Sequence, residues 1–321
     1  PVKKAIFRKL LPNPRVVDTL LRAGSPFQKL LLKDEQNPQK TACAPLLKSL
    51  FGDRHMPLLS DKPLRSKVGK WQARRKGGLR VAFFPGCMGD KIYTGVSEAC
   101  LKVFEHHGVG VFLSDNFACC GIPALVSGDR EGVEKMIEHN LGIFADHFDY
   151  IVTPCSSCTM TIKEYWPEMS RNLPASVQET AKKFGAKAID INAFLVDVLG
   201  VHPEAAKGGL KVTYHESCHL KKSLGVSKQP RELINMNKNC ELVEMVEPDR
   251  CCGCGGSFTL THYDLSLKMG QRKRDNVIAS GAEFGDGMPG LHDAASDMLA
   301  RNNDPVQVKH TIEIYAESLP L

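Results

Sequence analysis

The sequence predicts an α/β fold of two similar lobes, each a small parallel sheet flanked by helices, preceded by a basic helical leader. Two observations predict this fold. Short apolar runs alternate with helical stretches from residue 79 onward, and cysteines follow the ends of those runs in a pattern that recurs later in the chain. At 321 residues, the chain has room for about two domains. We expect the leader at residues 1–78, the first lobe at residues 79–200 and the second lobe at residues 205–321.

The leader is predicted to be helical and irregular. An apolar stripe at helical spacing follows the Pro-Asn-Pro break at residues 12–14, and it consists of Val16, Val17, Leu20 and Leu21. Residues 1–80 contain 19 lysine and arginine residues against 5 acidic residues, so they carry +14 while the remainder carries −8. This charge indicates either a solvated basic surface or a face for an acidic partner or an anionic membrane. Because the chain starts at Pro1, we expect an upstream part.

The first lobe has a regular order of elements. Apolar runs at residues 81–84, 109–113 and 150–152 predict three buried strands. Helical stretches follow them at about residues 96–104, at about residues 130–147 and from near Cys158. This βαβαβα order is typical of a parallel sheet covered by helices.

Cysteines follow each of the three strands. They form the pattern C-x31-CC-x34-C-x-x-C, at Cys87, Cys119, Cys120, Cys155 and Cys158. In open parallel sheets the carboxyl ends of the strands share one edge, where ligands bind. We therefore expect all five thiols to converge there. The adjacent pair needs a turn, and Gly121 can supply the unusual backbone conformation that such a turn requires.

Part of the pattern recurs in the second lobe. Predicted strands at residues 211–215 and 242–246 lead to Cys218 and to the pair Cys251-Cys252. Corresponding cysteines are 131 and 132 positions apart, which indicates an internal duplication. We expect the lobes to be related by a pseudo-twofold axis, with their cysteine edges facing each other.

The composition restricts the class of chemistry. No apolar stretch is long enough for a membrane span, and the N-terminus lacks the apolar core of a signal peptide. Twelve cysteines in such a chain favour metal ligation or redox chemistry over a disulfide framework. We expect a cytoplasmic protein, with peripheral contact at the inner face of the cell membrane as the alternative. Nothing beyond one basic run indicates nucleic acid.

Both zinc and iron–sulfur clusters use thiolate ligands. Five thiols in the first lobe exceed what one tetrahedral zinc ion or one four-iron cube needs, which favours an iron–sulfur centre. A zinc site and a dithiol redox site are the alternatives. Cys43, Cys100 and Cys240 lie outside the repeated pattern, and we expect them to be bystanders.

Several motifs carry a resemblance to a known family. They are Phe-Pro-Gly-Cys87, Cys119-Cys120-Gly121, Thr-Pro-Cys155-Ser-Ser-Cys158, His215-Glu-Ser-Cys218-His219 and Cys251-Cys252-Gly253-Cys254-Gly-Gly-Ser-Phe258. Over about residues 79–321 the chain resembles the duplicated cysteine-rich CCG domain. That domain occurs in heterodisulfide reductases, in the glycolate oxidase iron–sulfur subunit and in lactate-utilisation iron–sulfur proteins. The runs after Cys218 and Cys251 look most like the lactate and glycolate branch.

The resemblance implies a function in electron transfer. It implies an iron–sulfur subunit, of [4Fe-4S] type, that passes electrons from a flavoprotein oxidising lactate or glycolate toward quinone or another carrier. A ferredoxin-type module upstream is a further expected partner. The implied ligands are Cys87, Cys119, Cys120, Cys155 and Cys158 for the first cluster, and Cys218, Cys251 and Cys252 for a second cluster or zinc. No catalytic residue is assigned. The alternatives are a heterodisulfide-reductase-type catalytic subunit and a zinc-binding structural module.

The second lobe departs from the family pattern. The expected C-x-x-C is missing, because Met288 and Leu291 stand in its place, and the glycine-rich run at residues 281–290 predicts no strand before it. One hypothesis is a short out-of-frame segment, since residues 285–295 read one nucleotide later can restore both cysteines. The alternatives are an empty site, or a metal for which Cys254, His215 or His219 substitutes.

Overall fold

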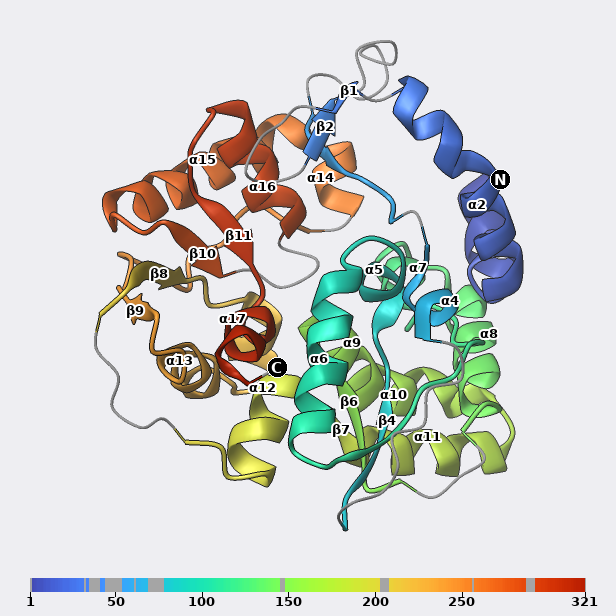
Figure 1. Cartoon of the computed structure of the whole chain (residues 1–321). Coiled ribbons are helices and arrows are strands. Elements are labelled where there is room, and N and C mark those ends of the chain that lie inside the picture. The colour runs from blue at the N-terminus through green and yellow to red at the C-terminus, as the bar shows by residue number, and fades with distance from the viewer. Residues whose placement is uncertain are drawn as a thin grey trace. The chain divides into compact units, whose positions relative to one another are not determined.

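The structure is a computed structural model that describes residues 2–31, 33–34, 41–43, 54–60, 62–68, 78–144, 148–202, 208–255, 257–286 and 292–320. It divides into two compact units (Figure 1). The first comprises Pro1–Arg22 and Lys62–Phe194, and the second comprises Ala23–Asp61 and Leu195–Leu321. The two predicted sheets lie in different units, and the leader contributes residues to both.

The first unit contains a four-stranded parallel sheet. Its strands are β4 (Arg80–Phe83), β5 (Gly110–Phe112), β6 (Tyr150–Thr153) and β7 (Ala188–Asp190), in the order β5-β4-β6-β7. Val81, Ala82 and Phe83 are all buried although successive side chains point to opposite faces. Both faces of the sheet are therefore covered, as the apolar runs predict.

Helices provide that cover. Phe83 on β4 packs edge-on against Phe104 of α6, with ring centroids 5.6 Å apart. On the chain that follows β5, the ring of Phe117 packs at a tilt against that of Phe144, with centroids 4.9 Å apart. The helices of this unit that follow the leader are α5 (Gly86–Lys91), α6 (Thr94–His106), α7 (Ile122–Val126), α8 (Arg130–Leu141), α9 (Ser156–Met160), α10 (Trp166–Met169), α11 (Ala175–Lys187) and α12 (Ile191–Ala193).

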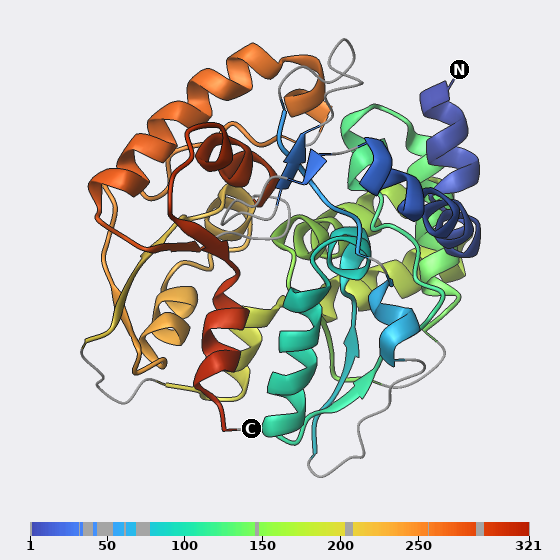
Figure 2. The ribbon, with the colours of Figure 1, turned by 45° about the horizontal axis from the view of Figure 1, so that its top comes forward.

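The second unit has its own parallel sheet, in the order β11-β10-β8-β9. The strands are β8 (Leu210–Tyr214), β9 (Cys240–Leu242), β10 (Phe284–Asp286) and β11 (Gln307–Lys309). Val212 and Tyr214 on β8 pack with Ile234 and Ile314. The helices are α13 (Lys228–Asn235), α14 (Ser257–Thr261), α15 (Tyr263–Ala279), α16 (His292–Arg301) and α17 (Thr311–Ser318). The helices α15 and α16 pack side by side (Figure 2).

The two sheets have the same topology. In each, the first strand of the lobe lies between the second and the third, and the fourth lies beyond the third. This repeated order confirms the prediction of two similar α/β lobes. That their cysteine edges face each other stays a prediction.

Some expected elements differ from those observed. The prediction that residues 281–290 contain no strand is wrong, because Phe284–Asp286 form β10, hydrogen-bonded on both sides between β8 and β11. A central strand is held by hydrogen bonds from its backbone N–H and C=O groups to the neighbouring strands, and glycine has these groups like other residues. The strand expected at residues 242–246 lies earlier, at Cys240–Leu242, and Val246 is exposed. Gln307–Lys309 form β11 ahead of the last helix, which begins at Thr311.

The leader is helical at its start, as expected. It contains α1 (Val2–Ala5), a π-helical turn at Ile6–Leu10, α2 (Pro14–Leu31) and α4 (Leu64–Val68). It also contains an unexpected antiparallel sheet of β1 (Lys33–Asp34), β2 (Thr41–Cys43) and β3 (Met56–Pro57), which is too short to leave a periodic pattern. Among the described helices, none combines the length and the apolar character that crossing a membrane requires.

Two glycines of the second unit allow a matched test of the backbone. Both have a left-handed backbone, with φ of +83° at Gly253 and +68° at Gly225. A Cβ at Gly253 would lie 2.4 Å from the carbonyl oxygen of Ser266, whereas nothing lies within 4 Å of a Cβ at Gly225. We expect Gly225→Ala to lower the free energy of unfolding by about 1 kcal/mol and Gly253→Ala by about 3 kcal/mol or more. Urea unfolding of the metal-free variants measures both, and equal losses would contradict the expected clash.

Candidate metal centre

Three loops at the carboxyl edge of the first sheet carry five cysteines. Cys87 lies in the first turn of α5, shortly after β4. Cys119 and Cys120 follow β5, and Cys155 and Cys158 follow β6. Because these strands are parallel neighbours, their carboxyl ends open on one edge. The expected placement of the cysteines at this edge is confirmed.

The five thiols contact one another in a continuous series. Cys87 is hydrogen-bonded to Cys119, and Cys119 to Cys120. The Sγ atoms of Cys120 and Cys158 are 3.5 Å apart, and Cys158 is also hydrogen-bonded to Cys155. Four of the five are buried, and Cys87 is half-buried. The structure thus brings together all five of the cysteines that the sequence singles out in this lobe.

Hydrogen bonds among the five thiols lower the pKa of two of them and raise the pKa of the other three. Hydrogen bonds from Cys119 and Cys158 lower the pKa of Cys120 to about 5, and a hydrogen bond from Cys158 lowers the pKa of Cys155. The pKa values of Cys87, Cys119 and Cys158 are raised, because each donates a hydrogen bond to a neighbouring sulfur. Five neighbouring thiols are donors of the kind that a thiolate-bound metal centre uses, and a bound metal deprotonates such ligands outright.

Glycines make room for the sulfurs. Gly86 has φ of +70°, and a Cβ there would lie 3.0 Å from the Sγ of Cys158. Gly121, directly after the adjacent pair, has φ of +102°. Both conformations are ones that glycine adopts without strain. The expectation that Gly121 supplies the turn after Cys120 is confirmed.

Two fully buried side chains hold the backbone of the adjacent pair. The Asn140 amide donates to the carbonyl of Cys119 at 3.0 Å and accepts from the amide of Ala118 at 2.9 Å. The indole of Trp166 donates to the carbonyl of Cys120 at 2.8 Å. Neither residue was predicted from the sequence. A polar asparagine on the apolar face of α8 was the one signal available.

The second lobe groups four cysteines. Cys218 is hydrogen-bonded to Cys251. Cys252 is buried, accepts a backbone N–H from Cys254 and lies within electrostatic range of the other three thiols. Burial, followed by the neighbouring sulfurs, raises the pKa of Cys252. The three predicted cysteines therefore lie together, and Cys254 joins them. The expected C-x-x-C positions, 288 and 291, lie outside the described residues.

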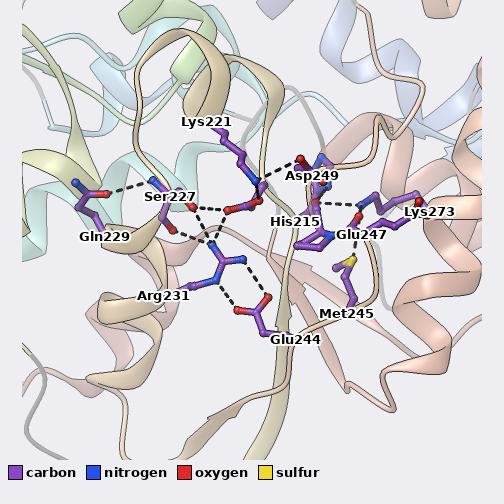
Figure 3. Close-up of polar contacts among 12 residues, drawn as sticks. His215, Lys221, Ser227, Gln229, Arg231, Glu244, Met245, Glu247, Asp249 and Lys273 are labelled. Carbon is purple, nitrogen blue, oxygen red and sulfur yellow. Dashed lines mark hydrogen bonds and ion pairs between the residues drawn. The ribbon is translucent and has the colours of Figure 1, made fainter.

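A buried lysine and a buried histidine hold the segment that leads to Cys251 (Figure 3). Lys273 is 4% exposed and donates to the carbonyls of Glu247 and Pro248 at 2.9 and 3.1 Å. His215 Nδ1 donates to the same Pro248 carbonyl, also at 3.1 Å. Burial lowers the pKa of Lys273 to about 8, and burial together with Lys273 lowers that of His215 to about 3. His215 is therefore neutral, and its Nε2 is buried without a hydrogen-bond partner among the described residues.

An ion-pair network fixes the turn before Cys218. Glu216 is 3% exposed and accepts from Lys221, from Ser227 and, at 2.8 Å, from Arg231. Burial alone would raise the pKa of Glu216, but these three donors lower it to about 2. Arg231 also pairs with Glu244 (Figure 3). Glu216 was not predicted from the sequence, because no periodic pattern distinguishes it from a surface glutamate.

The bystander cysteines lie in structural elements. Cys100 is fully buried in α6, and Cys240 lies in β9. Cys43 belongs to β2, and its side chain lies outside the described part of the chain.

The grouped thiols are not a formed coordination sphere. Within the described ranges, no three histidine, cysteine, aspartate or glutamate side chains stand in an arrangement that would hold a metal ion. The assignment of a metal or cluster to the eight predicted cysteines stays a prediction.

Comparison with known proteins agrees with the duplication. A family model described as "Cysteine-rich domain" (CCG) matches residues 81–163 and again residues 212–284. Lactate utilization protein A from Exiguobacterium sp. is 33% identical over 245 residues, which cover 74% of this chain and 98% of that protein. Its counterpart from Bacillus subtilis is 32% identical over 237 residues, with the same coverage.

Among solved structures, the chain matches a putative Asp/Glu racemase from Yersinia pestis. The match has a TM-score of 0.30 and 11% identity, and covers 74% of this chain and 96% of that one. This likeness is too slight to bear on fold or function. The two matches to the family model and the nearly full-length relatives are decisive. The chain belongs to the family of cysteine-rich CCG domain proteins that includes the lactate utilization A proteins.

Proposed function

We propose that this protein is an iron–sulfur electron-transfer subunit of a 2-hydroxy-acid dehydrogenase complex, of the lactate class. The observation that carries the proposal is the meeting of five cysteine thiols on one sheet edge, with four of them buried. Relatives named lactate utilization protein A support the choice of lactate over glycolate.

The residues of the first lobe have distinct roles in this proposal. Cys87, Cys119, Cys120, Cys155 and Cys158 would hold the cluster, which when bound exchanges single electrons. Hydrogen bonds from Asn140 and Trp166 fix the carbonyls of Cys119 and Cys120 and so orient the two adjacent sulfurs. The buried lining excludes water, which with hydrogen bonding sets the reduction potential of such a centre.

The proposed partners follow from what the chain lacks. Its sequence has no flavin or nicotinamide fingerprint, so oxidation of the 2-hydroxy acid falls to a flavoprotein subunit. Electrons would leave toward quinone or another carrier, with a ferredoxin-type module upstream as a further relay. We propose a cytoplasmic location with peripheral contact at the inner face of the membrane.

The second lobe would hold a metal through a changed ligand set. Cys218, Cys251 and Cys252 are joined by Cys254, whose backbone N–H bonds to the sulfur of Cys252. Four thiolates complete either one four-iron cube or one zinc ion. Cys254 then substitutes for the C-x-x-C that the sequence lacks.

The electron-transfer function predicts reduction by lactate. Protein purified without oxygen is mixed with a lactate-oxidising flavoprotein and L-lactate, and visible absorbance and EPR follow the cluster. We expect reduction of the wild type and of Cys100→Ser, since Cys100 lies apart in α6. In Cys155→Ser/Cys158→Ser, which leaves only three thiols at the first site, we expect the reducible signal of that site to fall more than about tenfold, so that any remaining signal comes from the second lobe.

The outcomes separate the candidate functions. A cluster that dithionite reduces but lactate with the flavoprotein does not would contradict the proposal. Reduction of a disulfide substrate by the chain itself would favour the heterodisulfide-reductase type.

The role of Cys254 is testable where the first site is disabled. In a Cys155→Ser/Cys158→Ser background, only three thiols remain at the first site, so the metal retained is assigned to the second lobe. We expect Cys254→Ser to lower that retained metal more than about tenfold, and Cys240→Ser to leave it unchanged, because Cys240 lies in β9. Iron with acid-labile sulfide identifies a cluster, and zinc without sulfide identifies a zinc site. Full retention without Cys254 would refute its role as a ligand.

A further inference from the structure

The leader lies against the cysteine edge of the first sheet. A small, partly open pocket of about 30 Å³ lies there, lined by Leu11, Pro14 and Val17 of the leader, by Arg65, and by Cys87 and Cys119. All of these residues belong to the first unit. The lining residues from the leader precede residue 81, where the match to the CCG family begins. The cover over these two cysteines therefore comes from a part of the chain outside the family domain.

Four charged side chains anchor this cover. Arg65 on α4 donates to Asp90 through its Nε, at 2.8 Å, and its Nη2 lies 2.6 Å from the same carboxylate. Lys91 pairs with Asp90 at 2.7 Å and with Asp18 of α2. Asp90 is only 1% exposed. Burial alone would raise the pKa of Asp90, but Arg65 and then Lys91 outweigh it and the pKa is lowered. The carboxylate is therefore charged and held by both cations.

Arg65 also reaches the loop that leads to the adjacent cysteines. Its Nη1 donates to the carbonyl of Asp115 at 2.9 Å, and its Nη2 donates to that of Phe117 at 3.2 Å. Asp90 lies three residues after Cys87, and Phe117 two residues before Cys119. One planar guanidinium with several fixed donors thus joins the leader, the Cys87 helix and the Cys119 loop.

We propose that residues 11–18 and 62–68 form a leader cap over the Cys87 and Cys119 side of the first site, with Arg65 as the positioning residue. The cap restricts the access of solvent, and of oxygen and thiol reagents dissolved in it, to that side, where Cys119 is buried and Cys87 is half-buried. Arg65 holds the segments carrying Cys87 and Cys119 at one fixed separation. That the cap protects a cluster rests on the proposed function. The cap's contacts with the Cys87 and Cys119 segments do not depend on that function.

Thiol alkylation of the reduced, metal-free full-length protein tests the cap without requiring any cluster. Short pulses of iodoacetamide, followed by peptide mass spectrometry, give a separate rate for each cysteine. We expect Arg65→Met to raise the rates of Cys87 and Cys119 about tenfold, because the cap opens locally. Cys155 and Cys158 follow β6 and are not among the residues that line the pocket with Arg65, so we expect their rates to stay within about twofold.

Arg8→Met is the matched control. It removes the same charge from the same leader, but Arg8 pairs with Asp129 at 2.8 Å and with Glu131, on the α8 side of the unit and outside the pocket lining. We expect its cysteine rates to match those of the wild type. Arg65→Lys keeps the charge but not the planar fork, so it should give intermediate rates.

Two results would overturn the proposal: unchanged rates for Cys87 and Cys119 in Arg65→Met, or an equal rise at all five cysteines. If Arg65→Met does not fold, Asp18→Asn loosens the cap from the leader side and should give the same selective pattern. In the metal-loaded protein, loss of the cap alone would leave the initial iron content normal. The visible absorbance would then be lost faster in air than in the wild type. Failure of the proposed function would instead appear as absent iron, with the alkylation pattern intact.

Discussion

The carboxyl edge of a parallel sheet is the constraint on which the first lobe depends. Five thiols from three loops meet because β4, β5 and β6 are parallel neighbours and end on the same side. Cys87 and Cys155 are 68 positions apart in the sequence, yet both belong to one series of sulfur contacts. An antiparallel arrangement of the same strands would send alternate loops to opposite edges and separate these ligands.

The local supports of the site act on the backbone. Gly86 gives the Cys158 sulfur space that a Cβ would occupy, and Gly121 allows the turn after the adjacent pair. Asn140 and Trp166 then fix the carbonyls of that pair. The second lobe uses the same strand order but different supports. There Lys273 and His215 hold Pro248, a few residues before Cys251.

The sequence was sufficient to predict those strands and cysteine positions for which the fold requires a particular residue pattern. Buried parallel strands need continuous apolar runs, and cysteines placed after them predicted the shared edge. The strand β10 could not be predicted, because its pairing is a backbone property of Phe284–Asp286 that a glycine-rich run conceals. The roles of Asn140, Glu216 and Arg65 depend on partners far along the chain, and no local pattern marks them.

The central claim is that these thiols hold an iron–sulfur centre. Iron, acid-labile sulfide and zinc content, with EPR, on full-length protein purified without oxygen tests it most directly. The account predicts at least about four irons and four sulfides per chain, with a signal that changes on reduction. About eight of each would mean that the second lobe holds a cluster as well. Zinc without iron or sulfide would contradict the account.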